Sequence, residues 1–316
     1  MSGKRPGETH LAPAEARAIA RAALAEHWPG TAFGLGCLKN TDKAQRAQVF
    51  CAASPDARLV VKVYAPASAD KARAQAARQR SVATAWPEGA PEVLFFDAAR
   101  LVLGMAYADG PSLAAVVPKR GREGAASQLE AAGRWLQRFH GLTREAHPFR
   151  PKGQIAWLHR LLEQHDGGER TIPEVNAFRR EVARLETMFQ AVRGTPSQRA
   201  VTHRDLHLAN LIATREGLVG LDFENAKPDE PLRDLVSLLI DAVALSDEAE
   251  ALDRHAAALS KGYGPVGSTP EAVVFLQRLF ALGVWANTPP EPSRRQAARY
   301  LAARQIIASE RALFAS

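Results

Sequence analysis

A short stretch near the middle of the chain has a high density of polar groups. "VTHRDLHLANLI", residues 201–212, places two histidines, an arginine, an aspartate and an asparagine between short apolar runs. Such a stretch indicates a metal site, a catalytic loop or a polar turn without chemistry. Asn210 lies five residues after Asp205, and Asp222 lies seventeen residues after it. The runs "NLIAT" and "LVGLDF", separated by "REG", predict a tight hairpin. This hairpin should bring the three side chains to one edge.

These three side chains have the chemistry of a magnesium site. Carboxylate and amide oxygens are hard donors, which suit Mg²⁺ and not zinc. A carboxylate that is left free could accept a proton from a hydroxyl group. His203 and His207 are four residues apart, as in helical zinc sites, but they lie in a predicted loop and no glutamate follows His203. We therefore expect magnesium here and no zinc.

A lysine within an apolar strand is the second unusual feature. Lys62 stands in "LVVKVYA", between Val60, Val61 and Val63. Burying an ammonium group costs on the order of several kcal/mol unless an anion meets it. An edge strand with its lysine in solvent is the alternative, and the flanking valines argue against it. We therefore expect Lys62 to meet an anionic ligand.

The elements around these residues follow a simple order. Residues 1–107 predict a leading helix, three strands, a helix and two more strands, whereas residues 108–316 are mainly helical apart from the hairpin. The expected helices cover 13–28, 68–86, 126–142, 153–165 and 172–192, and the expected strands cover 33–38, 47–53, 58–65, 92–99 and 100–108. The chain is thus predicted to be α+β, with an N-terminal lobe of five strands and one helix behind the leading helix.

The composition of the chain narrows the class of protein further. The 316 residues are 46% apolar, enough for a sizeable core, and no run of about 18 apolar residues predicts a membrane span. The first residues have no apolar signal core, so we expect a cytoplasmic protein. Cys37 and Cys51 share no metal spacing and are interpreted as two small buried thiols.

The net charge of +7 raises the question of a nucleic-acid partner. The arginines lie beside glutamates in predicted helices, as in "FRREVARLE" at 178–186, and no basic run is interleaved with aromatic residues. We therefore expect no nucleic-acid partner and no membrane partner. A basic surface also suits nucleotide phosphates.

A strand lysine, an aspartate with an asparagine five residues on, and an aspartate at the next strand end together resemble the kinase signature. The resemblance is closest to the aminoglycoside phosphotransferase and choline kinase-like family and covers roughly residues 30–245. "THRDLHLANLI" is similar to the catalytic loop of that family, and "VGLDFENA" to its metal-binding strand end. "LGMAYADGPSL" is similar to its hinge, and "PLRDLVSLLID" to its aspartate-bearing helix.

The resemblance implies a two-lobed protein kinase-like fold, with a small antiparallel-sheet lobe that binds nucleotide and a large, mainly helical lobe. It implies an ATP- and Mg²⁺-dependent phosphotransferase that acts on an alcohol group of a small molecule. Carried over residue by residue, the implied roles are catalytic base for Asp205, Mg²⁺ ligands for Asn210 and Asp222, phosphate contact for Lys62, adenine contact through the backbone for Met105, Ala106, Tyr107 and Ala108, and bracing of the catalytic loop for Asp234.

Two departures from the family pattern leave alternatives open. The helix at 68–86 lacks the usual glutamate that holds the strand lysine, although Gln79 lies near its position, and the segment after Gly34 and Gly36 has no third glycine. A catalytically weak or inactive nucleotide-binding or scaffold protein is therefore one alternative. A protein kinase-like enzyme with a macromolecular substrate is another.

The helices from 150 to 200 and beyond 245 are expected to build the pocket for the acceptor of the phosphoryl group. They contain no run of acidic residues flanked by aromatics, which a polycationic or choline-like acceptor would favour. We therefore favour a sugar, an amino alcohol or a similar metabolite. The sequence does not reveal the oligomeric state or the choice between ATP and GTP.

Overall fold

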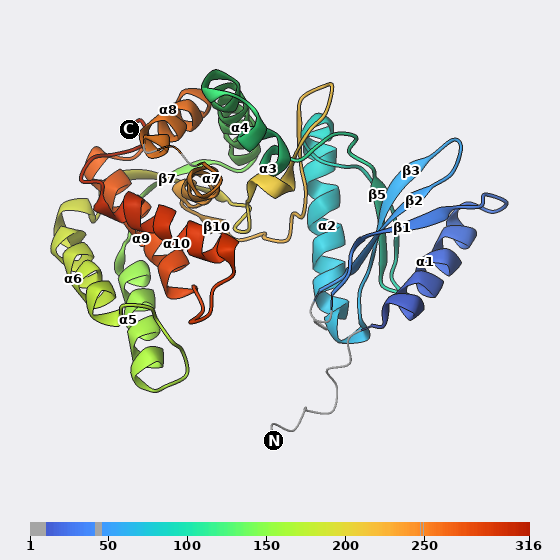
Figure 1. The fold of residues 1–316 in the computed structure, drawn as a ribbon, viewed down its shortest axis with the longest axis horizontal. Coiled ribbons are helices and arrows are strands. Elements are labelled where there is room, and N and C mark those ends of the chain that lie inside the picture. Colours follow the sequence, from blue (N-terminus) through green and yellow to red (C-terminus); the bar gives the residue numbers. More distant parts are fainter. Residues whose placement is uncertain (1–10, 42–45, 247, 249) are drawn as a thin grey trace. The chain divides into compact units, whose positions relative to one another are not determined.

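The computed structural model describes residues 11–41, 46–246, 248 and 250–316 (Figure 1). The chain divides into two compact units, each with its own core. The first consists of the chain up to Gly110 together with Ile212–Asn225, and the second of Pro111–Leu211 and Ala226–Ser316. The predicted hairpin thus belongs to the first unit, although helices flank it in the sequence. The division into an N-terminal lobe of residues 1–107 and a C-terminal lobe of residues 108–316 stays a prediction.

The first unit is built on a five-stranded antiparallel sheet, as predicted. Its strands are β1 (Gly34–Lys39), β2 (Gln48–Ala53), β3 (Arg58–Val63), β4 (Val93–Asp97) and β5 (Val102–Ala106). They are ordered β1-β2-β3-β5-β4. Lys62 lies on the central strand, paired with Val49 of β2 and Leu103 of β5. The alternative of a solvated lysine on an edge strand is therefore wrong.

One helix covers each face of this sheet (Figure 1). Successive side chains of a strand point to opposite faces. Val61 and Val63 pack with α1 (Pro13–His27), whereas Tyr64 packs with α2 (Ala69–Ala85). By the same alternation, Lys62 lies on the α2 side, on the same face as Tyr64.

A glycine fixes the path of the chain after β5. Gly110 has φ +159°, and a Cβ atom there would lie 2.0 Å from the carbonyl oxygen of Ala213. Ala213 ends β8 (Leu211–Ala213), which pairs with β9 (Leu218–Gly220) to form the predicted hairpin. A side chain at position 110 would collide with this hairpin. Only glycine therefore allows the segment after β5 to pass so close to it. Two short 3-10 helices, η1 (Pro66–Ser68) and η2 (Pro87–Gly89), flank α2.

The second unit is mainly helical, and α7 and α9 are its most buried helices. Its helices are α3 (Leu113–Val116), η3 (Val117–Lys119), α4 (Arg122–Gly141), α5 (Lys152–Asp166), α6 (Val175–Val192), η4 (Leu208–Asn210), α7 (Leu232–Ala244), α8 (Ala251–Tyr263), α9 (Pro270–Ala286) and α10 (Arg294–Ala308). Helices α4 and α8 pack backbone to backbone, because a Cβ atom at Gly262 would lie 2.0 Å from the carbonyl oxygen of Glu130. Among the described residues, no helix has the length and apolar character needed to cross a membrane.

A small sheet in the second unit was not predicted. Strands β6 (Glu145–Pro148), β7 (Pro196–Val201) and β10 (Pro228–Asp229) are antiparallel in the order β10-β7-β6. Each contains a proline, and none combines length with a clear apolar alternation, so the usual strand signals are weak. This sheet matters because β7 leads directly into the stretch at 202–207.

The cysteines differ from the expectation. Cys37 is exposed, Cys51 is half-buried, and both are free thiols. In the β1–β2 register Cys37 lies opposite Phe50, whereas Cys51 lies opposite Gly36, so the two side chains point to opposite faces. The interpretation of both as buried thiols is therefore wrong for Cys37.

Glu230 is a buried carboxyl group that follows the small sheet. Its Oε2 accepts a hydrogen bond of 2.7 Å from the Ser197 hydroxyl, and its Oε1 lies 2.9 Å from His147 Nε2. Burial raises the pKa of Glu230 to about 7, because desolvation disfavours its charged form.

The unfolding free energy should depend on this carboxyl group. The unfolded chain releases the Glu230 proton near pH 4.5, whereas the folded chain releases it near pH 7. The stability that the neutral form provides is therefore fully present below about pH 4.5 and is lost as pH rises towards about 7. We expect the unfolding free energy of Glu230→Gln, measured by urea denaturation, to rise relative to that of the parent protein as pH rises. The relative gain between about pH 5 and about pH 8 should be about 2 kcal/mol. A difference that does not change with pH would contradict this assignment.

Candidate active site

A fully buried carboxylate holds the loop at 202–207. Asp234, in the first turn of α7, accepts hydrogen bonds of 2.6 Å from the backbone N–H of His203 and 2.9 Å from that of Arg204. His140 Nε2 lies 3.0 Å from the same carboxylate. Burial works to raise the pKa of Asp234, but the bonds from His140 and His203 favour the charged form and hold that pKa below its usual range. The predicted bracing role of Asp234 is confirmed.

His140 completes this buried network. Its ring is inaccessible to solvent, and its Nδ1 lies 3.0 Å from the hydroxyl of Tyr263. Both ring nitrogens therefore have partners, as in a structural core histidine.

Two of the residues that the sequence singled out have a left-handed backbone. Arg204 has φ +68° and Asp222 has φ +65°. Non-glycine residues adopt this conformation rarely, and it occurs more often where a site requires a particular side-chain direction. At Arg204 the bond from its N–H to Asp234 holds the turn that delivers the chain to Asp205.

Asp205 is exposed but oriented. Its side chain is 82% accessible, and His207 Nε2 lies 3.0 Å from its Oδ1. On the other side of the ring, His207 Nδ1 lies 3.1 Å from Nη1 of Arg299. Because a guanidinium group can only donate, Nδ1 must accept and Nε2 must carry the hydrogen that is donated to Asp205. This hydrogen bond from His207 holds the pKa of Asp205 below its usual range.

Asp241 anchors this arrangement from within α7. Its side chain is buried and accepts hydrogen bonds from the backbone N–H of Leu208 at 2.9 Å and from Arg299 at 2.6 Å. Arg295 donates to the same carboxylate at 3.0 Å. Asp241, Arg299, His207 and Asp205 thus form a chain of hydrogen bonds. Of these four residues, the predicted site list contained only Asp205. Asp241 was missed, although a charged residue within the apolar run "LVSLLIDAVAL" was a signal for it.

Asn210 ends η4, and its side-chain amide is anchored on the loop through its nitrogen. Its Nδ2 donates to the backbone oxygen of Asp205 at 2.9 Å, and its N–H donates to the backbone oxygen of His207 at 2.8 Å. No described residue donates to Oδ1, so this oxygen suits a metal ligand. The predicted convergence of Asp205 and Asn210 with Asp222 involves residues of both compact units, and it stays a prediction.

Within the first unit, Lys62 meets a carboxylate. Its Nζ contacts Oδ1 of Asp222, and the lysine side chain is 9% exposed. Next to this pair, Lys71 of α2 lies 3.1 Å from Glu224. Lys62 thus has an anionic partner within its own unit, and its contact with an anionic ligand stays a prediction.

The glutamines of α2 do not take the place of the missing glutamate. Gln79 donates to the backbone oxygen of Pro91 at 2.8 Å, and Gln75 accepts a hydrogen bond from the hydroxyl of Tyr64. Both are buried in the packing of the first unit. The partner that the sequence left uncertain is thus Asp222.

The segment predicted to meet adenine begins at the end of β5. Met105 is buried, and the N–H of Ala106 donates to the backbone oxygen of Glu92 at 2.9 Å. Tyr107 follows, with the guanidinium of Arg58 4.1 Å from its ring centre. The N–H of Ala106 is thus already used within the unit, and the adenine contact stays a prediction for Met105, Ala106, Tyr107 and Ala108.

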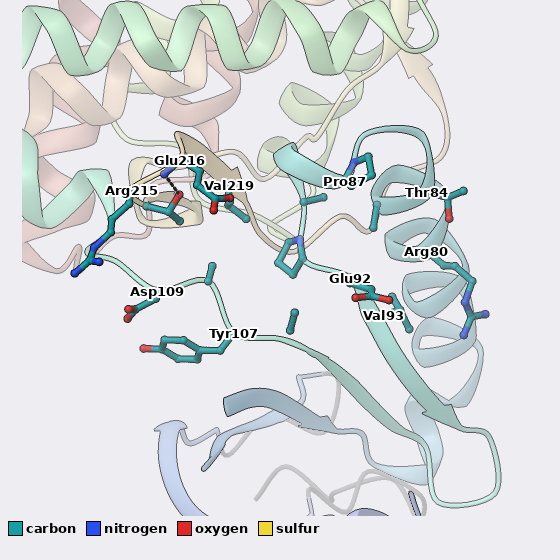
Figure 2. Close-up of a pocket in the computed structure, with 16 residues that line it drawn as sticks. Arg80, Thr84, Pro87, Glu92, Val93, Tyr107, Asp109, Arg215, Glu216 and Val219 are labelled. Carbon is teal, nitrogen blue, oxygen red and sulfur yellow. Dashed lines mark hydrogen bonds between the residues drawn. The ribbon is translucent and has the colours of Figure 1, made fainter. Parts of the chain in front are cut away.

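A cavity of about 870 Å³ lies in the first unit beside this segment (Figure 2). Figure 2 shows its labelled side chains, which come from α2, from the chain between η2 and the start of β4, from the segment after β5 and from the hairpin. Ala106, Tyr107 and Ala108 line it, whereas Lys62 and Met105 do not. The cavity therefore does not gather the whole set of predicted nucleotide contacts.

A second cavity, of about 350 Å³, lies within the second unit and includes Asp205. It is formed by side chains of the loop at 202–207 and of helices α5, α7, α9 and α10, among them Trp157, Arg204, Arg233, Phe280 and Arg299. The sequence predicted an acceptor pocket from the helices at 150–200 and beyond 245. Helix α7 lines the cavity in addition, and α6 does not appear among its described lining residues.

An antiparallel sheet unit with a buried strand lysine, and a helical unit with a braced aspartate–asparagine loop, are the features of a kinase-like fold. The chain belongs to the phosphotransferase enzyme family, whose family model matches residues 40–269. No curated protein matches the sequence.

Solved structures with the same fold are distant in sequence. A choline/ethanolamine kinase family protein from Mesorhizobium loti is 20% identical, with a TM-score of 0.60 over 93% of this chain and 95% of that one. The choline kinase LicA from Streptococcus pneumoniae is 15% identical, with a TM-score of 0.58 over 92% and 98%. The aminoglycoside phosphotransferase APH(3'')-Id from Streptomyces rimosus is 15% identical, with a TM-score of 0.51 over 92% and 98%. The resemblance to the aminoglycoside phosphotransferase and choline kinase-like family is confirmed, and the chain is a member of the phosphotransferase enzyme family with a kinase-like fold.

Loss of the loop brace should cost stability. Asp234→Ala leaves the buried imidazole of His140 and two backbone N–H groups without their acceptor. We expect the unfolding free energy in urea at neutral pH to fall by about 3 kcal/mol or more. As a matched control, Asp253→Ala removes an exposed partner of Arg311 and should cost under about 1 kcal/mol. Equal losses in the two variants would argue against the bracing role.

His207 should act on catalysis through Asp205. His207→Ala removes a hydrogen bond to the charged carboxylate, so the pKa of Asp205 should rise and the acid limb of the kcat profile should move to higher pH. We also expect kcat to fall about 10-fold, because the carboxylate is no longer oriented.

Two further variants test this assignment. His207→Gln, whose amide can donate in place of Nε2, should recover part of kcat. His159→Ala, which removes an exposed partner of Glu186, should leave the profile in place. An unchanged acid limb in His207→Ala would show that the imidazole does not influence Asp205.

Proposed function

We propose that this protein is an ATP- and Mg²⁺-dependent kinase that transfers the γ-phosphoryl group to a hydroxyl of a small molecule, with Asp205 as the catalytic base. The observation that carries the proposal is the setting of Asp205. Its carboxylate is exposed, oriented by His207 and located in a cavity of about 350 Å³. A positioned carboxylate beside a cavity of this kind suits general-base catalysis on a bound hydroxyl.

The two oxygens of Asp205 have different environments. Oδ1 accepts from His207, and no described residue donates to Oδ2. The acceptor hydroxyl would therefore donate to Oδ2 while its oxygen attacks the γ-phosphorus, the bond from that phosphorus to the bridging oxygen breaks, and ADP leaves. Because the pKa of Asp205 is low, the carboxylate mainly orients the hydroxyl and takes its proton late. This order suits the loose transition state of phosphoryl transfer.

The nucleotide and metal contacts follow the family pattern. Lys62 would bind the α- and β-phosphates, and residues 105–108 would contact adenine through their backbone. Asn210, through its free Oδ1, and Asp222 would hold Mg²⁺, since an amide and a carboxylate oxygen are hard donors. Bound Mg²⁺ would neutralise charge on the phosphates. In support, the solved structure of the amicoumacin kinase hAmiN, which has a TM-score of 0.57 to this chain, is a complex with AMP-PNP and Ca²⁺.

The alternative of a weak or inactive relative rested on the missing helix glutamate and on the glycine-poor segment after Gly36, and the described contacts bear on the first of these. Lys62 nevertheless has a carboxylate partner, Asp222, on its own unit. An active kinase therefore fits the described contacts better than a scaffold.

Activity should depend on both aspartates. ATP consumption is first screened against pooled metabolites, with ATP and GTP as donors, to find a turned-over hydroxyl compound. With that compound, Asp205→Asn should lower kcat by about 10² to 10⁴-fold and Asp222→Ala should abolish Mg²⁺-dependent turnover. The matched control Asp166→Asn, in an exposed pair with Arg179, should keep full activity. Wild-type turnover in both site variants would refute the assignment.

A further inference from the structure

The cavity around Asp205 is rich in cationic side chains. Arg204, Arg233 and Arg299 line it, and Asp205 is the one carboxylate among the described residues that do so. An acceptor bound here would be surrounded by guanidinium groups. The balance of charge around the cavity therefore bears on the kind of acceptor it can take.

One pair of arginines shares a single carboxylate. Nε of Arg233 lies 2.6 Å from Oδ2 of Asp229, and Nη2 of Arg204 lies 3.4 Å from the same oxygen. The Asp229 side chain is 13% exposed. Two positive charges thus meet one negative charge, and one positive charge is left unbalanced.

A second pair repeats this pattern. Arg295 and Arg299 both donate to Oδ1 of Asp241, at 3.0 Å and 2.6 Å, and the carboxylate is buried. Again, one positive charge is left over. Apart from Asp205 itself, the charged groups around the cavity therefore have a positive excess, with two guanidinium groups for each carboxylate.

Arg233 is oriented to bind a ligand. Its Nε is fixed by Asp229, and its guanidinium carbon lies 4.6 Å from the ring centre of Phe280. Its two Nη groups make no hydrogen bond to any described residue, and the side chain is 34% exposed. A planar fork held in this way matches a carboxylate or a phosphate, which it can bind with two parallel hydrogen bonds. Trp157 and Ile240 add apolar lining, which strengthens such an interaction.

We propose that the acceptor of the phosphoryl group carries an anionic carboxylate or phosphate in addition to its hydroxyl, and that Arg233, assisted by Arg204, binds this anion. The inference rests on the proposed function, because the hydroxyl must reach Asp205 in the same cavity. An ammonium-bearing acceptor would meet the positive excess and be repelled. A sugar acid or sugar phosphate therefore fits the cavity, and the amino alcohol that the sequence also allowed does not.

The first test compares acceptors that differ mainly in charge. Glucuronate, glucose 6-phosphate, glucose and glucosamine form one matched set, and glycerate, glycerol 3-phosphate, glycerol and ethanolamine form another. ADP formation is measured with Mg²⁺ and ATP at constant ionic strength. We expect kcat/KM for an anionic member to exceed that of its neutral and ammonium counterparts by at least about 10-fold. The carboxylate and phosphate members show which anion is preferred. Preference for the ammonium or neutral member would overturn the proposal.

The second test measures binding without turnover. In the Asp205→Asn background, calorimetric titration with glucuronate, glucose 6-phosphate and inorganic phosphate should detect binding of at least one anion. Arg233→Gln should weaken it about 10-fold or more. Arg233→Lys keeps the charge without the fork and should weaken it less. Arg180→Gln, an exposed arginine of α6, should leave it unchanged. Denaturation midpoints check that each variant is folded.

The outcomes separate this inference from the proposed function. Anion binding that depends on Arg233, without turnover of any acceptor, would support the anion site and count against the kinase. Turnover with a higher kcat/KM for ammonium acceptors than for anionic ones would support the kinase and overturn the anion site. An increase in the KM for ATP in Arg233→Gln, with no change for the acceptor, would assign the positive charge to the nucleotide and also overturn it. If none of the three anions bound, the anion site would also be overturned.

Discussion

The buried carboxylate of Asp234 is the interaction on which the site depends. It accepts hydrogen bonds from two successive N–H groups of the loop and contacts His140 from another helix. A fully buried charge is expensive unless such bonds satisfy it, so the loop, α4 and α7 must be assembled together for it to be tolerated. The left-handed turn at Arg204 is held by the same bonds. The position of Asp205 therefore follows from the packing of the helical unit.

The other carboxylates of the site hold cations in place. Asp241 orients Arg299, which fixes the hydrogen on His207, and Asp229 orients Arg233 beside the cavity. In each case a mostly buried anion directs a guanidinium group that is itself closer to solvent. Buried ion pairs contribute little net stability, because desolvation offsets their attraction. Their effect here is to set direction and charge around Asp205.

Much of the architecture was predictable from local patterns. The helices α2, α4, α5 and α6, the five-stranded sheet and the hairpin follow from apolar periodicity and turn residues, so their existence was predicted with ends shifted by a few residues. The small sheet β6-β7-β10 was missed because its strands are short and contain prolines. Cys37 was misplaced because strand β1 is exposed along most of its length, which a short apolar run does not reveal.

The sequence by itself determined the elements, the kinase-like motifs and the candidate residues Lys62, Asp205, Asn210 and Asp222, since these depend on residue types at short spacings. The tertiary structure decided which side chains meet. Lys62 and Asp222 are 160 residues apart, Arg299 and His207 are 92 apart, and Arg299 and Asp241 are 58 apart. Periodicity reports which face of an element is apolar, but it contains no information on which distant polar groups share a buried site. That pairing is set by helix packing and by the need to satisfy each buried charge.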